Sequence, residues 1–154
     1  MNIMDFLSKE AISANLESKN KKGIIEELTG LLVKTKEIRN KDNIVKILLQ
    51  REALGSTGIG NGIAIPHGKS DKVKKLVAAL GISKQGVDFE SLDGEPVYIF
   101  FLLVAPIDSA GPHLKALARI SRLLKDKSFR NTLKAAKTKE ELVEIITKED
   151  QRRQ

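Results

Sequence analysis

Apolar residues recur at helical spacing over two stretches in the first third of the chain. Residues 20–36 carry them at i, i+4 and i+7 behind Asn20, which suits the N-cap position of a helix. A second amphipathic stretch starts near Asn40 or Asp42 and continues toward Arg51. These spacings predict two consecutive helices, each with one apolar face turned toward a core.

The middle of the chain changes from helical spacing to short apolar runs bounded by turn residues. Residues 63–65, 76–83 and 97–105 are apolar and in part β-branched or aromatic, a pattern that predicts buried strands. Asp93-Gly94 lies between the last two runs. This dipeptide is a hairpin-turn signal, so the chain is expected to reverse there.

Helical spacing returns at Gly111 and continues toward the end of the chain. One side of the predicted helix carries four residues: Leu114, Leu117, Ser121 and Leu124. A shorter helix is predicted around residues 128–136. The last one starts at Thr138, where Thr138 and Glu141 have the spacing of a capping box.

The order of elements is therefore two helices, central strands, then helices. This order predicts one α/β domain over residues 1–150, with a single mixed β-sheet flanked by helices. Residues 151–154 are expected to form a polar tail. A chain of 154 residues is long enough to bury about two-thirds of its extended surface, which suits one domain.

Composition disfavours several classes of protein and of binding partner. No apolar run reaches the ~20 residues that cross a bilayer, and the first residues lack the layout of a signal peptide. The chain has no cysteine, and we expect a cytoplasmic protein without direct membrane insertion. The formal charge is +7, but basic residues are interspersed with acidic ones and no aromatic stacking motif is present, so no nucleic-acid partner is expected.

The stretch GIGNGIAIPHGK, residues 58–69, contains four glycines and the first of two histidines. Its composition fits a nucleotide cradle, a metal site, a reactive histidine or a tight turn. A Walker A loop requires glycine where Ile63 stands, and a dinucleotide fingerprint requires a helix where a strand follows Gly60. His67 and His113 lack cysteines or carboxylates at ligand spacing, which disfavours a metal.

His67 follows the first predicted strand. Pro66 can donate no further ladder hydrogen bond, and Gly68 is expected to let the chain turn sharply. The imidazole would then sit at a strand end, where it is both anchored and reachable. A turn histidine without a chemical role is the alternative at this point.

Pro112-His113 opens the next helix, and Pro112 suits the first helical position. His113 is then expected in the first turn, away from the apolar face, where free N–H groups favour an anion and disfavour imidazole protonation. If it meets His67, the pair offers a nucleophilic nitrogen beside an anion site. Ser109 and Arg51 are candidate further donors, and the combination suits phosphoryl transfer.

These residues carry a family resemblance. The segment RE…STGIGNGIAIPHG (Arg51-Glu52, then residues 56–68) resembles the phosphorylation-site signature of the fructose/mannitol-type enzyme IIA domains of the bacterial phosphoenolpyruvate-dependent sugar phosphotransferase system. The likeness continues through GVDFESLDGEPV and KTKEELVEIIT and spans essentially the whole chain. It implies the enzyme IIA fructose/mannitol-like fold, a single mixed sheet flanked by helices, and a phosphotransferase of the histidine-phosphocarrier type.

The resemblance also implies roles for residues. His67 looks like the nucleophile that takes a phosphoryl group from phospho-HPr, the small carrier protein, as a transient phosphohistidine without cofactor or metal. His113 resembles the second histidine, which hydrogen-bonds the phosphoryl group, and Arg51 resembles the active-site arginine. The next partner would be a IIB-domain cysteine on another chain or a regulatory protein.

Two subgroups fit this resemblance. The stretch GSTGIGNGIAIPHGK and the lack of fused domains favour the nitrogen-regulatory IIA protein, which binds regulatory partners according to its phosphorylation state. The alternative is the IIA component of a fructose-like sugar permease, which passes its phosphoryl group to the IIB cysteine.

Overall fold

The computed structural model describes residues 1–153, and its centre is a mixed sheet of six strands. The strands are β1 (Leu7–Ser13), β2 (Gly58–Gly60), β3 (Ile63–Ala64), β4 (His67–Lys69), β5 (Val77–Val87) and β6 (Val97–Ala105). They follow the order β1-β5-β6-β3-β2, and β4 pairs with β6 further along the edge that β3 uses. The predicted single mixed sheet is confirmed, because β5–β6 and β2–β3 are antiparallel and the other pairs parallel.

Strand β6 explains why the sheet is covered on both faces. Successive side chains of a strand point to opposite faces, so an unbroken apolar run needs a core on each side. Ile99, Phe101 and Leu103 belong to one core cluster, and Phe100, Leu102 and Val104 belong to the other. The sheet therefore lies between two helical layers.

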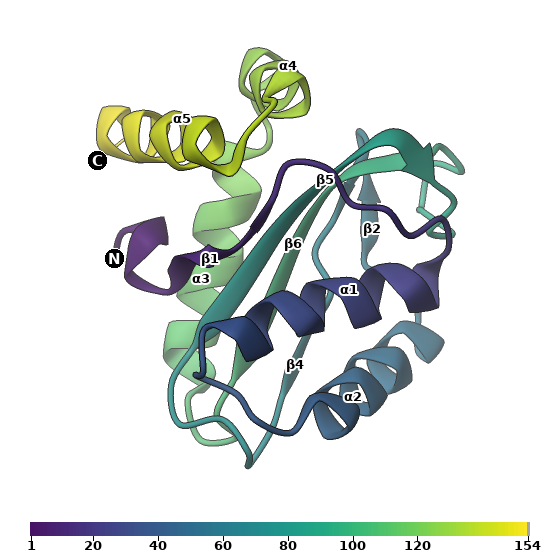
Figure 1. Ribbon diagram of the computed structural model, residues 1–154, viewed down its shortest axis with the longest axis vertical. Helices are drawn as coiled ribbons and strands as arrows, with labels where there is room; N and C mark the ends of the chain where they lie inside the picture. The colour runs from purple at the N-terminus through teal and green to yellow at the C-terminus, as the bar shows by residue number, and fades with distance from the viewer. Residues whose placement is uncertain (154) are drawn as a thin grey trace.

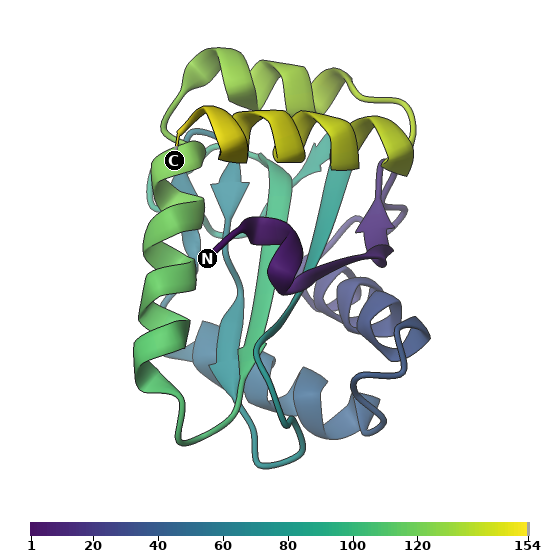
Figure 2. The ribbon, with the colours of Figure 1, turned by 90° about the vertical axis from the view of Figure 1, so that its left-hand side faces the viewer.

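One helical layer comes from a single stretch of the chain and the other from both of its ends (Figures 1 and 2). Helices α1 (Lys21–Lys34) and α2 (Lys41–Ala53) cover one face. The other face is covered by the 3-10 helix η1 (Ile3–Asp5) with α3 (Ala110–Leu123), α4 (Lys127–Ala135) and α5 (Lys139–Arg152). All five predicted α-helices are present. Within residues 1–153, none is both long and apolar enough to cross a membrane.

Three of the predicted helix starts are confirmed by their caps. The side chains of Asn20 and Asn40 accept hydrogen bonds from backbone N–H groups three residues further on, at 2.8 and 3.1 Å. Thr138 accepts from the backbone of Glu141 at 3.1 Å, as a capping box requires. The Glu141 carboxylate, however, accepts from the N–H of Lys137, one residue before the cap.

Three strands were not predicted from the sequence. β1 has the sequence LSKEAIS, in which three consecutive polar residues interrupt the apolar pattern. The structure accommodates them by a register shift between Leu7 and Ile12 in the pairing with β5. β2 and β4 are too short, at three residues each, to show a period. The predicted reversal at Asp93-Gly94 is present within the longer connection 88–96, where Gly94 has φ +72°.

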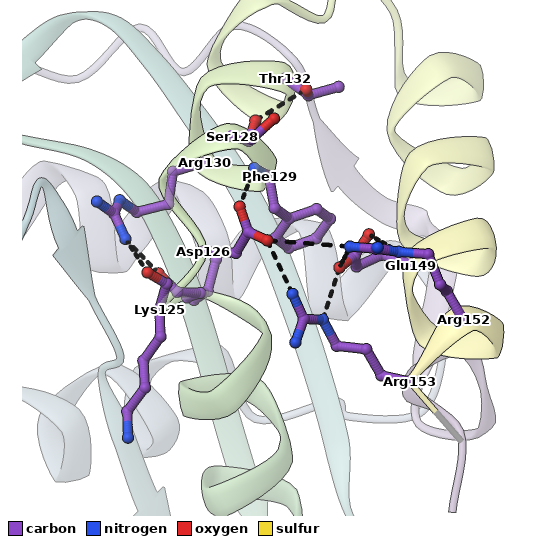
Figure 3. A network of polar contacts seen from close by, with 10 residues as sticks. Lys125, Asp126, Ser128, Phe129, Arg130, Thr132, Glu149, Arg152 and Arg153 are labelled. Atoms are coloured by element: carbon purple, nitrogen blue, oxygen red, sulfur yellow. Dashed lines mark hydrogen bonds and ion pairs between the residues drawn. The ribbon is translucent and has the colours of Figure 1, made fainter.

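Residues 151 and 152, part of the polar tail expected over residues 151–154, belong to the last helix. Helix α5 continues to Arg152, and Figure 3 shows how its end binds the start of α4. Arg153 donates to Asp126 at 2.8 Å and to Glu149 at 2.6 Å. Asp126 also caps α4 by accepting from the N–H of Phe129 at 3.1 Å. Gln154 lies outside the described residues.

A buried carboxylate joins three distant segments on the same side of the sheet. Asp150 of α5 accepts a hydrogen bond from the N–H of Ile3 in η1 at 2.6 Å. It also accepts from Arg119 Nε of α3 at 2.6 Å and pairs with a second guanidinium nitrogen. Only 3% of Asp150 is exposed, so this ion pair locks the N-terminus, α3 and α5 together away from solvent.

Candidate phosphoryl-transfer site

The glycine-rich stretch forms a tight hairpin that leads the chain to His67. β2 and β3 run antiparallel, and Gly60, Asn61 and Gly62 between them all have positive φ, from 57° to 97°. Glycine adopts such angles without a steric cost. The carbonyl of Gly62 accepts from the N–H groups of Tyr98 and Ile99, at 2.9 and 3.0 Å, which fixes the hairpin on β6. The predicted turning role is confirmed for Gly60 and Gly62.

His67 is the first residue of β4. It lies opposite Leu103 in β6, and the carbonyl of Pro66 accepts from the N–H of Leu103 at 2.9 Å. The imidazole is half-buried, and its Nδ1 lies 2.8 Å from the carbonyl oxygen of Ile65. Because a carbonyl only accepts, Nδ1 must carry the proton in the neutral ring. Nε2 then holds the free lone pair, which is the property a nucleophile needs.

Gly68 does not turn the chain, contrary to the sequence-based expectation. It lies within β4, and its φ is not among the positive values. A Cβ atom at this position would lie 2.9 Å from Cγ2 of Ile47 in α2. Glycine is therefore required because α2 packs closely over the strand beside His67.

His113 occupies a different place in its helix than predicted. Ser109 is the N-cap of α3, so Pro112 is the third helical residue and not the first. Pro112 has no N–H, and the N–H of His113 donates to the carbonyl of Ser109 at 3.2 Å. The Ser109 hydroxyl donates to the carbonyl of Pro106. The N–H of His113 and the hydroxyl of Ser109 are thus engaged within the helix start.

The side chain of His113 is buried, which also corrects the prediction. Only 5% of the residue is exposed, and it shares the inner face of α3 with Ala116 and Ile120. Leu114, expected on that face, is 67% exposed. The face of α3 that meets the sheet carries His113, Ala116, Ile120 and Leu123, at i, i+3, i+7 and i+10, so Leu114 points away from it. Within the described residues, His113 Nδ1 has no hydrogen-bond partner.

Burial lowers the pKa of His113 below its ordinary value of 6.5, and positive charge at His67 and Lys69 lowers the pKa further. The ring is therefore neutral at pH 7. The proton of the neutral ring is disfavoured on Nδ1, because a buried N–H donor without an acceptor costs free energy. The proton of the neutral ring is then expected on Nε2, which can donate to a group in the pocket.

The two histidines meet, as the sequence analysis hypothesised. Their ring centroids lie 5.5 Å apart, and the rings stand edge to face at 81°. Both line a pocket of about 580 Å³ between the end of α2, β4 and the start of α3. Arg51 lines the same pocket, and its Nη1 donates to the carbonyl of Gly55 at 2.7 Å.

Two residues of this region were not recognised from the sequence. Lys69 lines the pocket two residues after His67, and alternate residues of a strand share a face, so the spacing could have identified it. Glu52 is buried, accepts from the N–H of Thr57 at 3.1 Å and from its hydroxyl, and pairs with Lys21 at 3.2 Å. It thereby fixes the loop between α2 and the glycine hairpin.

Within residues 1–153, no three histidine, cysteine or carboxylate side chains gather where they could hold a metal ion. The arrangement instead combines a nucleophilic imidazole nitrogen, a neutral imidazole donor and two cations. In such a set, His67 can form a covalent bond to an anionic group. The other residues can stabilise that group by hydrogen bonding and charge.

Known proteins are similar to this chain in sequence and in fold. A nitrogen regulatory protein of Bradyrhizobium diazoefficiens is 40% identical over 148 residues, which cover 95% of each chain. The fructose-specific EIIABC component of Bacillus subtilis is 39% identical over 97% of this chain, which spans only 24% of that relative's length. The crystal structure of nitrogen regulatory protein IIA-Ntr from Neisseria meningitidis superposes with a TM-score of 0.87 at 33% identity, covering 94% of this chain and 98% of that one.

The family description that fits is "Phosphoenolpyruvate-dependent sugar phosphotransferase system, EIIA 2", which matches residues 5–149. The match includes the glycine hairpin, both histidines and all five α-helices except the last residues of α5. The enzyme IIA fold expected from the resemblance is thereby confirmed. The chain belongs to the EIIA 2 family of the phosphoenolpyruvate-dependent sugar phosphotransferase system.

Proposed function

We propose that this protein is a phosphoryl carrier that uses Nε2 of His67. The lone pair of Nε2 attacks the phosphorus of a phosphohistidine on an HPr-type carrier protein. The new Nε2–P bond forms as the P–N bond of the donor breaks, and the donor imidazole keeps the bonding pair. The observation that supports this choice of atom most directly is the 2.8 Å contact between His67 Nδ1 and the Ile65 carbonyl, which leaves Nε2 unprotonated.

His113 and Arg51 are proposed to stabilise the transferred group. The neutral His113 ring donates its Nε2 hydrogen to a phosphoryl oxygen, and this contact lies in a mostly buried place where hydrogen bonds are stronger. Arg51 lies on the pocket wall but is held by the Gly55 carbonyl in the unmodified protein. A phosphoryl group on His67 would compete for this guanidinium. The mechanism requires no cofactor and no metal.

The biological role proposed is that of a nitrogen-regulatory IIA protein, whose phosphorylation state governs its binding to a regulatory partner. The likeness to nitrogen regulatory proteins, in sequence over 95% of each chain and in structure, supports this choice. The alternative is the IIA component of a fructose-type permease, supported by the similar identity to a fructose-specific relative. In that case the phosphoryl group passes to a IIB cysteine on another chain.

The chemistry is tested by incubating the purified protein with phosphoenolpyruvate, enzyme I and HPr. We expect acid-labile, base-stable labelling of the wild-type protein and none of His67→Ala. His113→Ala should still be labelled, but more slowly, because the nucleophile is intact. Equal loss of labelling in both variants, with both folded by circular dichroism, would contradict these roles.

The two roles are separated by the fate of the phosphoryl group. A carrier for transport loses its label on addition of a matching IIB protein, and a cysteine-free IIB variant prevents this loss. A regulatory protein instead binds its target with different affinity in the unmodified form and in a His67→Glu variant. Rapid transfer to IIB would overturn the regulatory proposal and favour the permease.

A further inference from the structure

The pocket around His67 and His113 is larger than a phosphoryl group. Its volume of about 580 Å³ lies within the range of pockets that bind whole small molecules, roughly 300 to 1,000 Å³. A phosphoryl group with three non-bridging oxygens fills only the part next to the histidines. The remaining space has its own lining, which indicates what could occupy it.

Four aliphatic side chains from two helices line the pocket. Ile47 and Leu54 belong to α2 and to its C-cap, and Leu114 and Leu117 belong to α3. Leu54 and Leu114 are 86% and 67% exposed, an unfavourable situation for large aliphatic side chains. An apolar group seated between these side chains would remove them from water.

The pocket also carries positive charge. Arg51 and Lys69 line it, and no carboxylate is among the lining residues in the described part of the chain. His113 adds a buried neutral ring, one nitrogen of which has no partner. The charges therefore favour an anion, and the neighbouring leucines favour an apolar substituent on it.

We propose that this pocket binds a small organic phosphate monoester, with its phosphate between His113, Arg51 and Lys69 and its hydrocarbon part between Leu54 and Leu114. The bound ester covers Nε2 of His67 and keeps a phosphorylated partner away. Binding of the ester does not depend on the proposed function. Only its competition with phosphoryl transfer rests on that function.

Binding is tested on the unphosphorylated protein alone, by NMR of the carbon-bound imidazole protons. The chain has two histidines, so His67→Ala assigns the signals. The probes are phenyl phosphate, inorganic phosphate and benzyl alcohol. We expect phenyl phosphate to shift both histidine signals and to bind roughly tenfold more tightly than inorganic phosphate, because burial of part of a phenyl ring adds to the ionic contacts. Benzyl alcohol at the same concentration should cause no shift.

Two variants separate the apolar contribution from the charge. Leu114→Ser is on an exposed position, so the fold should persist, and it should bring the affinity for phenyl phosphate close to that for inorganic phosphate. Lys69→Gln should weaken both probes by a similar factor. Leu92→Ser is the matched control, because Leu92 is 78% exposed but does not line the pocket.

Equal affinity for phenyl phosphate and inorganic phosphate in the wild-type protein would overturn the proposal, as would an equal effect of Leu92→Ser and Leu114→Ser. Competition is then measured by the rate of labelling from phospho-HPr with and without phenyl phosphate. We expect slower labelling of the wild type and a smaller effect on Leu114→Ser. A protein that binds the probe but is never labelled would contradict the proposed function and leave the binding site intact.

Discussion

His67 and His113 stand edge to face with ring centroids 5.5 Å apart, although one belongs to strand β4 and the other to helix α3. Their environments differ. His67 is half-buried and its Nδ1 is paired with a backbone carbonyl, whereas His113 is nearly fully buried and its Nδ1 is unpaired. Two identical side chains are thus prepared for different tasks, a nucleophile and a donor.

This difference predicts how His113 titrates. Burial is the first cause of its lowered pKa, followed by charge at His67 and Lys69 on β4. Arg51 is the other cationic residue that lines the pocket. We expect the His113 signals in an NMR pH titration to change with a midpoint below pH 6.5, the ordinary value. His67→Gln should raise the pKa of His113 partly, because burial remains.

The same shift affects stability. Below pH 6.5 the unfolded chain binds a proton at His113 that the folded protein does not, so the free energy of unfolding should fall as the pH decreases through this region. Well above pH 6.5, His113 is neutral in both states and does not make the free energy of unfolding depend on pH. A His113 signal that titrates above pH 6.5 would contradict both expectations.

Gly68 is predicted to be intolerant of a side chain. A Cβ atom would lie 2.9 Å from Cγ2 of Ile47, so Gly68→Ala should push α2 from β4 and lower the free energy of unfolding by about 1–3 kcal/mol. Denaturation by urea, followed by circular dichroism, measures this loss. Gly111→Ala is the matched control, since that glycine has open space around its Cβ position and lies in a helix.

The cause is tested by a second substitution. Ile47→Ala removes the Cγ2 atom, so the double variant Gly68→Ala/Ile47→Ala should be more stable than the sum of the two single losses predicts. Strict additivity would mean that the clash with Ile47 is not the reason for glycine at this position.

Glu52 should contribute more to the free energy of unfolding than Glu90, which is exposed and pairs with the same lysine. Both Glu52 and Glu90 pair with Lys21, at 3.2 and 3.4 Å, but Glu52 is buried and also binds the backbone and hydroxyl of Thr57. We expect Glu52→Gln to lower the free energy of unfolding by about 2 kcal/mol, because the buried network loses one of its two acceptor oxygens and the negative charge opposite Lys21. Glu90→Gln should change it by less than about 0.5 kcal/mol. Similar losses from the two substitutions in urea denaturation would be evidence against a role for burial.

The sequence was most informative where one local signal decides the structure. The caps at Asn20, Asn40 and Thr138 placed three helices, because each side chain bonds a backbone group only three residues away. The long apolar run of β6 indicated a strand buried on both faces. β1 was missed because its polar centre is tolerated only through a register shift against β5, which is a tertiary feature.

The site was predictable in its residues but not in its geometry. The glycine hairpin and the isolated His67 can be recognised locally. The burial of His113 depends on which face of α3 packs against the sheet, and that packing is a tertiary feature. The reason for Gly68 lies in α2, which approaches β4 only in the folded protein. Neither relationship has a signal within a few residues of the site.

The last prediction concerns Asp150, which joins η1, α3 and α5 through Ile3 and Arg119. Asp150→Asn keeps the shape but leaves Arg119 without a counter-charge in a mostly buried place, so it should lower the free energy of unfolding by about 3 kcal/mol. Glu144→Gln is the control on the same helix, because its exposed pair with Lys148 contributes only about 0.3–0.5 kcal/mol. Urea denaturation measures both.

The contacts of Asp150 also predict which backbone amides should exchange faster when the carboxylate is removed. Because Asp150 binds the N–H of Ile3, amide hydrogen exchange at Ile3 should accelerate in Asp150→Asn more than exchange in the β5–β6 pair, which this contact does not support. Uniform acceleration across the sheet would instead mean that the ion pair contributes to global stability alone. A protected Ile3 amide in the variant would show that the asparagine oxygen replaces the carboxylate, and that the charge of Asp150 serves Arg119 only.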